Sequence, residues 1–246
     1  MPLQKIIFFI SLFGLFLGNS SQSKAQGGGP PMLTDDPGTP GNNNWEINST
    51  INTSFRRSTE LEVPLLDINY GLKNRTQLKI EMPYILVNDS ANKFNTGLGN
   101  PLPGIKFRFV EDTIHSFTIS TFPQISVPLI KGGERELKLP VEFEKQFGIW
   151  TLGEEVGYIS FSPGEGNFFS GTLVGVKLSS RFDLMGEIYV ETNFLKENTT
   201  SILANTGLRF VINDRLIFMH SMGTQLAALN TERTYFISFT GVQWLF

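Results

Sequence analysis

The chain has 246 residues, of which 17% are charged, and its formal net charge is −3. No basic field exists that would favour nucleic acid or an anionic surface, so we exclude nucleic-acid binding. The lack of cysteine excludes disulfides, thiol catalysis and thiolate metal sites, and two histidines are too few for a multi-histidine metal centre. Low charge together with 24 glycines and 22 phenylalanines suits a membrane barrel, which has many turns and many aromatic residues.

The first 25 residues have the three-part layout of a secretory signal. Lys5 precedes an apolar run from Ile6 to Leu17, and polar residues then lead to Ala25. The run of about 12 residues is too short to cross a bilayer, which needs roughly 20. We therefore predict a signal peptide over residues 1–25 that is removed on export. Because no other segment is long and apolar enough for a transmembrane helix, residence in a membrane requires strands.

Residues 26–43 are rich in Gly, Pro, Asp and Asn, a composition that supports neither a helix nor a strand ladder. We predict that they form a flexible periplasmic segment or a partial plug of the barrel. The adjacent carboxylates of Asp35 and Asp36 allow two interpretations, a cation site or a turn capped by Asp before Pro37. The composition favours the turn, and we predict no metal site and no cofactor.

From residue 44 onward, segments of about ten residues alternate apolar and polar side chains, which is the period of a strand. In the clearest segment, Gln77 to Leu86, apolar side chains share one face and Gln77, Lys79 and Glu81 share the other. Pro64 predicts a bulge or a strand edge within its own segment, because proline removes a ladder hydrogen bond. Helical periodicity is absent along this part of the chain.

The connections between these segments also alternate, with short turns such as residues 73–75 and 213–215 and longer links such as residues 88–104. Short periplasmic turns and long external loops are typical of outer-membrane barrels, and closure removes the strand edges that lipid would not tolerate. The sequence therefore predicts an all-β fold: a closed antiparallel up-and-down transmembrane β-barrel of about 12 strands over residues 44–246.

The last strand, Glu232 to Phe246, ends on an aromatic residue, whereas most chain ends are polar and frayed. Val242, Trp244 and Phe246 lie on one face of this strand and resemble the assembly signal that barrel assembly machinery reads. A buried last strand of a soluble sandwich is the alternative, and the body of the chain favours the barrel. We expect the last strand to pair with the strand that begins near Trp45.

If the apolar faces contact lipid, the charged residues on the opposite faces line the lumen. They are Glu46, Lys79, Glu81, Lys106, Arg108, Lys138, Glu142, Glu144, Glu187, Glu191 and Arg209. A ring of such charges selects solutes in many channels. Paired charges also fill narrow barrels as a structural ion network, and about 12 strands is an intermediate size. We favour the network without excluding a path through it.

We predict no enzyme activity. A serine and a histidine on one strand must stand two residues apart to share a face, but His220 precedes Ser221 and His115 precedes Ser116 directly. Cross-strand pairs stay open at this point. Glu142 and Glu144 share a face and resemble a carboxylate dyad, yet neighbouring lumen carboxylates belong more simply to the network.

Several segments resemble the outer-membrane barrels grouped as the MetA pathway of phenol degradation family. They are residues 34–41 (Thr-Asp-Asp-Pro-Gly-Thr-Pro-Gly), 45–48 (Trp-Glu-Ile-Asn), 64–72 (Pro-Leu-Leu-Asp-Ile-Asn-Tyr-Gly-Leu), 77–79 (Gln-Leu-Lys), 83–84 (Pro-Tyr) and 104–109 (Gly-Ile-Lys-Phe-Arg-Phe). The resemblance implies a Gram-negative outer-membrane protein that takes up aromatic or other hydrophobic compounds. We expect a passive channel for small solutes, surrounded by outer-membrane lipids. The alternative is a structural or interaction barrel without transport.

Overall fold

The computed structural model describes residues 31–88, 94–129, 135–161, 165–193, 198–231 and 233–246. The predicted signal peptide and residues 26–30 lie outside this range. No helix in the described part of the chain is long and apolar enough to cross a membrane.

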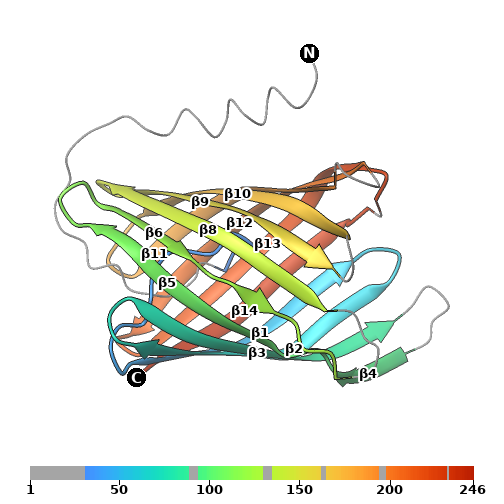
Figure 1. Cartoon of the computed structure of the whole chain (residues 1–246), viewed down its shortest axis with the longest axis horizontal. Coiled ribbons are helices and arrows are strands. Elements are labelled where there is room, and N and C mark those ends of the chain that lie inside the picture. The colour runs from blue at the N-terminus through green and yellow to red at the C-terminus, as the bar shows by residue number, and fades with distance from the viewer. Residues whose placement is uncertain (1–30, 89–93, 130–134, 162–164, 194–197, 232) are drawn as a thin grey trace, which may run out of the picture.

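The described residues form a single closed sheet (Figure 1). Its strands are β1 (Trp45–Phe55), β2 (Thr59–Leu72), β3 (Thr76–Asn88), β4 (Phe94–Leu98), β5 (Leu102–Asp112), β6 (Phe117–Thr121), β7 (Gln124–Ile125), β8 (Glu136–Phe147), β9 (Trp150–Phe161), β10 (Glu165–Lys177), β11 (Phe182–Asn193), β12 (Thr199–Asn213), β13 (Leu216–Leu229) and β14 (Phe236–Leu245). Each pairs antiparallel with its neighbours, and the β3–β5 and β1–β14 ladders close the ring.

Two strands of the barrel wall are each broken into two segments. Both β4 and β5 pair with β3, and both β6 and β7 pair with β8, so each pair of segments forms one wall strand with a short break. The result is the 12-strand antiparallel barrel that the sequence predicted. One expectation was wrong in detail, because β4 lies inside residues 88–104, which the sequence indicated as a link. The short, Gly-containing β4 carries too little alternation to be recognised without its partner β3.

The wall is apolar outside and polar inside, which is the inverse of a soluble barrel. On β5, Ile105 and Phe107 are exposed by 54% and 46%, whereas the side chains between and beside them, Lys106 and Arg108, are exposed by only 2% and 6%. This alternation continues through the neighbouring strands, as the sequence predicted. A continuous apolar exterior is stable against lipid hydrocarbon and not against water, so these strands span a membrane.

The bulge predicted at Pro64 is confirmed, because the β2–β3 register shifts between Glu62 and Leu65. The last strand pairs with β1 as expected, with Ile47 opposite Trp244, and Trp45 and Phe246 exchange backbone hydrogen bonds of 3.0 and 2.9 Å. Trp244 and Phe246 lie on the exposed outer face together with Val242. Their recognition by assembly machinery stays a prediction.

Candidate functional site: the barrel lumen

Residues 31–44, here called the inner segment, lie inside the barrel. Thr34 and Thr39 are exposed by only 1% and 4%, and their contacts come from distant parts of the chain. The segment leaves the lumen at the turn end of the wall, where Asn43 N donates to Gly71 O at 2.8 Å. Here Gly71 is required, because a Cβ at this position would lie 1.6 Å from the carbonyl oxygen of Gly41.

Carboxylates of the wall hold the inner segment by its backbone. Glu187 on β11 accepts hydrogen bonds from Leu33 N at 2.8 Å and Thr34 N at 2.9 Å, one on each carboxylate oxygen. Glu155 on β9 accepts from Asp35 N at 3.1 Å. These are charge-assisted bonds in a confined space, where each is stronger than a neutral hydrogen bond. The inner segment continues into β1 along the chain, and these bonds fix it to the opposite wall.

Lys106 is the centre of the buried charges. Its Nζ lies 3.2 Å from Asp35 Oδ1 and 3.3 Å from Glu142 Oε2, and it also donates to the carbonyl oxygen of Asp36. The Phe122 ring lies 4.7 Å from the same Nζ, close enough for a cation–π contact. Lys106 thus joins β5, β8 and the inner segment.

The electrostatics of the two aspartates differ although they are adjacent. Burial alone would raise the pKa of the Asp35 carboxyl, but the positive charges of Lys106, Lys79 and Lys138 outweigh it and lower this pKa to about 2. Burial raises the pKa of Asp36, and the neighbouring Asp35 carboxylate adds to this effect against the attraction of Lys106. Asp36 also caps Gly38 N at 2.6 Å, which is the hydrogen bond that the turn interpretation predicted. Among the described residues no group of three or more acidic or histidine side chains is placed to hold a metal ion.

The other charged residues predicted for the lumen also lie on the inner side of the wall. Lys79 contacts Asp67 at 3.7 Å and Glu81 at 2.5 Å, and Lys138 contacts Glu155 at 2.7 Å. Arg108 pairs with Glu111 at 3.2 Å. Four further members bond to amides: Glu46 with Asn48, Glu144 with Gln146, Glu191 with Asn167, and Arg209 with Gln243.

Three members of this inner network were not among the predicted residues. Glu155 is fully buried and joins Lys138 to the inner segment, Ser120 donates to Glu142, and Asp35 pairs with Lys106. The alternation of β9 carried a signal for Glu155, because Leu152 and Val156 face outward and residues 153 and 155 must then face inward. Asp35 had no such signal, since the inner segment has no periodicity.

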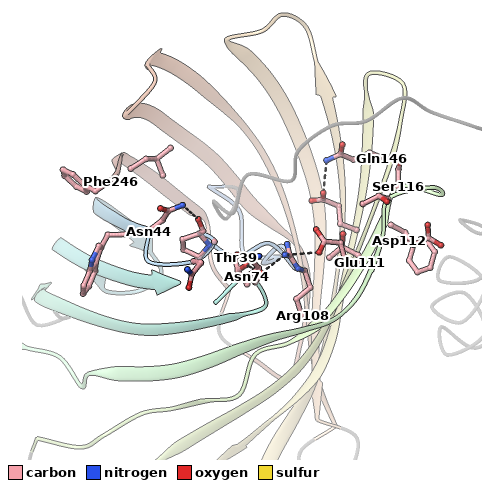
Figure 2. Close-up of a pocket in the computed structure, with 18 of the residues that line it drawn as sticks. Thr39, Asn44, Asn74, Arg108, Glu111, Asp112, Ser116, Gln146 and Phe246 are labelled. Atoms are coloured by element: carbon pink, nitrogen blue, oxygen red, sulfur yellow. Dashed lines mark hydrogen bonds and ion pairs between the residues drawn. The ribbon is translucent and has the colours of Figure 1, made fainter. Parts of the chain in front are cut away.

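Two cavities lie in the lumen on either side of the inner segment. The cavity toward the turn end has a volume of about 1210 Å³. Figure 2 shows Thr39 and Asn44 of the inner segment on one side of it, and Arg108, Glu111 and Gln146 of the wall on the other. The cavity toward the loop end has a volume of about 590 Å³ and is bordered by Met32, Leu33 and Asp35.

The loop-end cavity has an acidic and an apolar part. Nine acidic residues line it, namely Asp35, Asp36, Glu46, Glu60, Glu62, Asp67, Glu81, Glu136 and Glu191, against four basic residues, namely Arg56, Lys79, Lys106 and Lys138. Ile159 and Tyr189 also face this cavity, and they pack with Phe169 and Leu203 in an apolar cluster. The lining can therefore accommodate a positive charge and an apolar group together.

The two histidines and Ser221, which were considered for catalysis, contact other residues. Ser221 faces inward and donates to Pro31 O, whereas the neighbouring His220 contacts Thr240 Oγ1 at 2.9 Å. His115 lies at the turn end, with its Nδ1 2.8 Å from Asp112 Oδ2. Glu142 and Glu144 have separate partners, Lys106 and Gln146.

The fold and lumen define a 12-strand membrane barrel with an occupied interior. No family model and no curated protein matches the sequence. Among solved structures, the COG4313 outer membrane channel from Pseudomonas putida F1 has a TM-score of 0.69 at 11% identity, covering 92% of this chain and 100% of that chain. The KdgM porin has a TM-score of 0.60 at 8% identity, and the NanC porin 0.55 at 10%; each alignment covers 81% of this chain and 98% of the other. At these identities the likeness is one of fold, and the fold is that of outer-membrane channel barrels.

Proposed function

We propose that this protein is a passive outer-membrane channel for small solutes, in which the inner segment controls the path. The observation that carries this proposal is the pair of cavities, about 590 and 1210 Å³, that lie on either side of the inner segment. A barrel serving only as a scaffold does not need such space at both ends of its lumen. The fold, shared with barrels described as channels and porins, supports the same function.

The lining of the loop-end cavity supports a narrower class of solute. Its excess of carboxylates favours cations over anions, because rings of acidic side chains attract counter-ions. The apolar cluster around Ile159 and Tyr189 suits an aromatic or aliphatic group. The preferred solutes are then small, hydrophobic or aromatic, and carry a positive charge. The resemblance to the MetA-pathway barrels agrees with the hydrophobic part of this assignment.

The cellular setting belongs to the same proposal and rests on the sequence. Signal-peptide removal places the chain in the periplasm of a Gram-negative bacterium, and barrel assembly machinery then recognises Val242, Trp244 and Phe246. The apolar exterior contacts outer-membrane lipids. Each step belongs to the proposal, and no catalytic step is assigned to the lumen.

Liposome swelling with the purified full chain tests transport directly. The panel contains aromatic and aliphatic solutes of similar size, each as an amine, a neutral alcohol and a carboxylate. We expect the aromatic amines to enter fastest and the carboxylates slowest. Deletion of residues 31–40 is expected to raise the rates several-fold, because it removes the backbone that lies between the two cavities.

A matched control is Glu111→Gln, which alters the turn-end cavity without touching the carboxylates that hold the inner segment. No uptake of any solute by either the full chain or the deletion variant would reject the channel. The better assignment would then be a structural or interaction barrel, which an occupied lumen also fits. Uptake that favours carboxylates would reject the solute class alone.

A further inference from the structure

Glu154 carries its carboxyl group on the lipid face of the barrel. On β9 the neighbours Gly153 and Glu155 are buried in the interior, whereas Val156 is exposed by 48% on the outside. Glu154 stands on this outer face, opposite Phe143 of β8 and Thr172 of β10. The three strands lie side by side in one wall (Figure 1).

The level of Glu154 in the membrane is given by the aromatic residues of its own strand. Glu154 lies midway between Trp150 and Tyr158, about 13 Å along the strand from each at about 3.3 Å per residue. Aromatic side chains at strand ends mark the two lipid–water boundaries of a barrel. Glu154 is therefore near the middle of the apolar band, beyond the reach of lipid headgroups.

Within its own chain this carboxyl is only half satisfied. Thr172 Oγ1 donates to Oε2 at 2.9 Å. In the part of the chain that the structure describes, Oε1 has no hydrogen bond and no ion pair, although Lys145 lies on the same outer face, on β8 opposite Leu152. Hydrocarbon offers no hydrogen-bond partner, and a polar group left unpaired there is costly.

A second copy of the chain supplies the missing group by symmetry. If a two-fold axis along the membrane normal passes between β9 and β10, Oε1 of Glu154 meets Thr172 of the partner subunit, and the reverse contact is equivalent. Each threonine hydroxyl donates its one proton within its own subunit, so a neutral Glu154 carboxyl donates Oε1–H to the hydroxyl oxygen of the partner's Thr172. Around them Val141, Val156 and Val174 are exposed by 45%, 48% and 45%, and these compact side chains permit close approach of two walls.

We propose that Glu154 and Thr172 form the centre of a two-fold contact between two copies of this chain within the membrane. The outer faces of β3 and β5, in contrast, carry Leu78, Ile80, Ile105 and Phe107. Lipid satisfies such a surface fully. A contact with a two-fold axis at the β9–β10 wall closes as a dimer.

The lack of cysteine makes cross-linking a clean test. Val174→Cys places one thiol beside the proposed axis, and Ile51→Cys places one on the opposite wall at a nearly equal exposure of 46%. Each full-length variant is reconstituted in lipid vesicles and treated with copper phenanthroline. We expect a dimer band from Val174→Cys at least about tenfold stronger than from Ile51→Cys, matching a preference of about 1.4 kcal/mol.

Two further substitutions are made in the Val174→Cys background. Glu154→Leu is expected to abolish the dimer band while the barrel stays folded, because leucine suits the lipid face. Glu154→Gln retains a donor and an acceptor and is expected to preserve most of the band. Equal bands from Val174→Cys and Ile51→Cys, or a band undiminished by Glu154→Leu, would overturn the proposal.

Discussion

Glu154 and Glu155 are neighbours in the chain, yet they occupy opposite environments. Glu155 faces the lumen, where Lys138 lies 2.7 Å away and Asp35 N donates to it at 3.1 Å. Glu154 faces lipid and has one threonine hydroxyl. Adjacent residues of a strand face opposite sides of the sheet, so one glutamate bonds to groups in the lumen and the next one faces lipid. For these two residues, the face of the strand on which the side chain lies determines the role, because the residue type is the same.

The largest expected difference comes from replacing each carboxylate by leucine. Glu155→Leu leaves the Lys138 ammonium without its partner in the interior, which costs about 3 kcal/mol of unfolding free energy by analogy with broken buried ion pairs. Glu154→Leu is expected to change the unfolding free energy of one barrel by less than about 1 kcal/mol, or to raise it. Urea titration of both variants in lipid vesicles measures the two values. Equal losses would contradict the assignment of the two faces.

Inside the barrel, Glu187 holds two backbone amides of the inner segment. Glu187→Gln replaces one acceptor by a donor, so at least one charge-assisted bond is lost, a change of about 2 kcal/mol. We expect faster proteolysis at residues 31–40 while the wall stays folded. Glu191→Gln is the matched control, because Glu191 is bonded to Asn167 on the wall. Equal protease sensitivity in the two variants would show that Glu187 does not hold the segment.

A smaller effect is expected from acid, and it concerns Asp35. Because the pKa of Asp35 is lowered to about 2, its carboxylate contributes stability that is present above the ordinary value of 3.8 and is lost as the pH falls through about 2. The full contribution is about 2 kcal/mol. Channel current of the full chain is expected to rise reversibly between pH 4 and 2. Asp35→Asn is expected to have the raised current already at neutral pH, and a wild-type current that does not change would count against this anchor.

The fold could be predicted because one property, alternation with period 2, specifies a barrel strand by strand. Lys106 and Arg108 were placed inside for this reason, and the terminal Phe246 was placed beside the first strand. The same rule determines the inward direction of Glu155, although Glu154 and Glu155 were not assigned to opposite faces from the sequence. Alternation does not specify which inward groups meet, since this depends on tilt and stagger around the ring.

The position of the inner segment could not be predicted from alternation. Its composition excluded a strand and a helix, which left a flexible tail and a plug as equal choices. Its position depends on contacts such as Leu33 with Glu187, which are 154 residues apart in the chain. No local pattern encodes such contacts. The pairing of Thr172 with Glu154 was likewise visible only once the β9–β10 register was known.

The attachment of the inner segment to β1 has a consequence for how the molecule is made. The wall residues that grip it, Glu155, Glu187 and Ser221, belong to strands synthesised later, and the ring joins only where β14 meets β1. The early residues can therefore lie on the concave side of an unfinished sheet while it curls around them. Threading through a completed mouth is unnecessary. An inner segment in place before β14 meets β1 would be enclosed by the wall without passing through a finished opening.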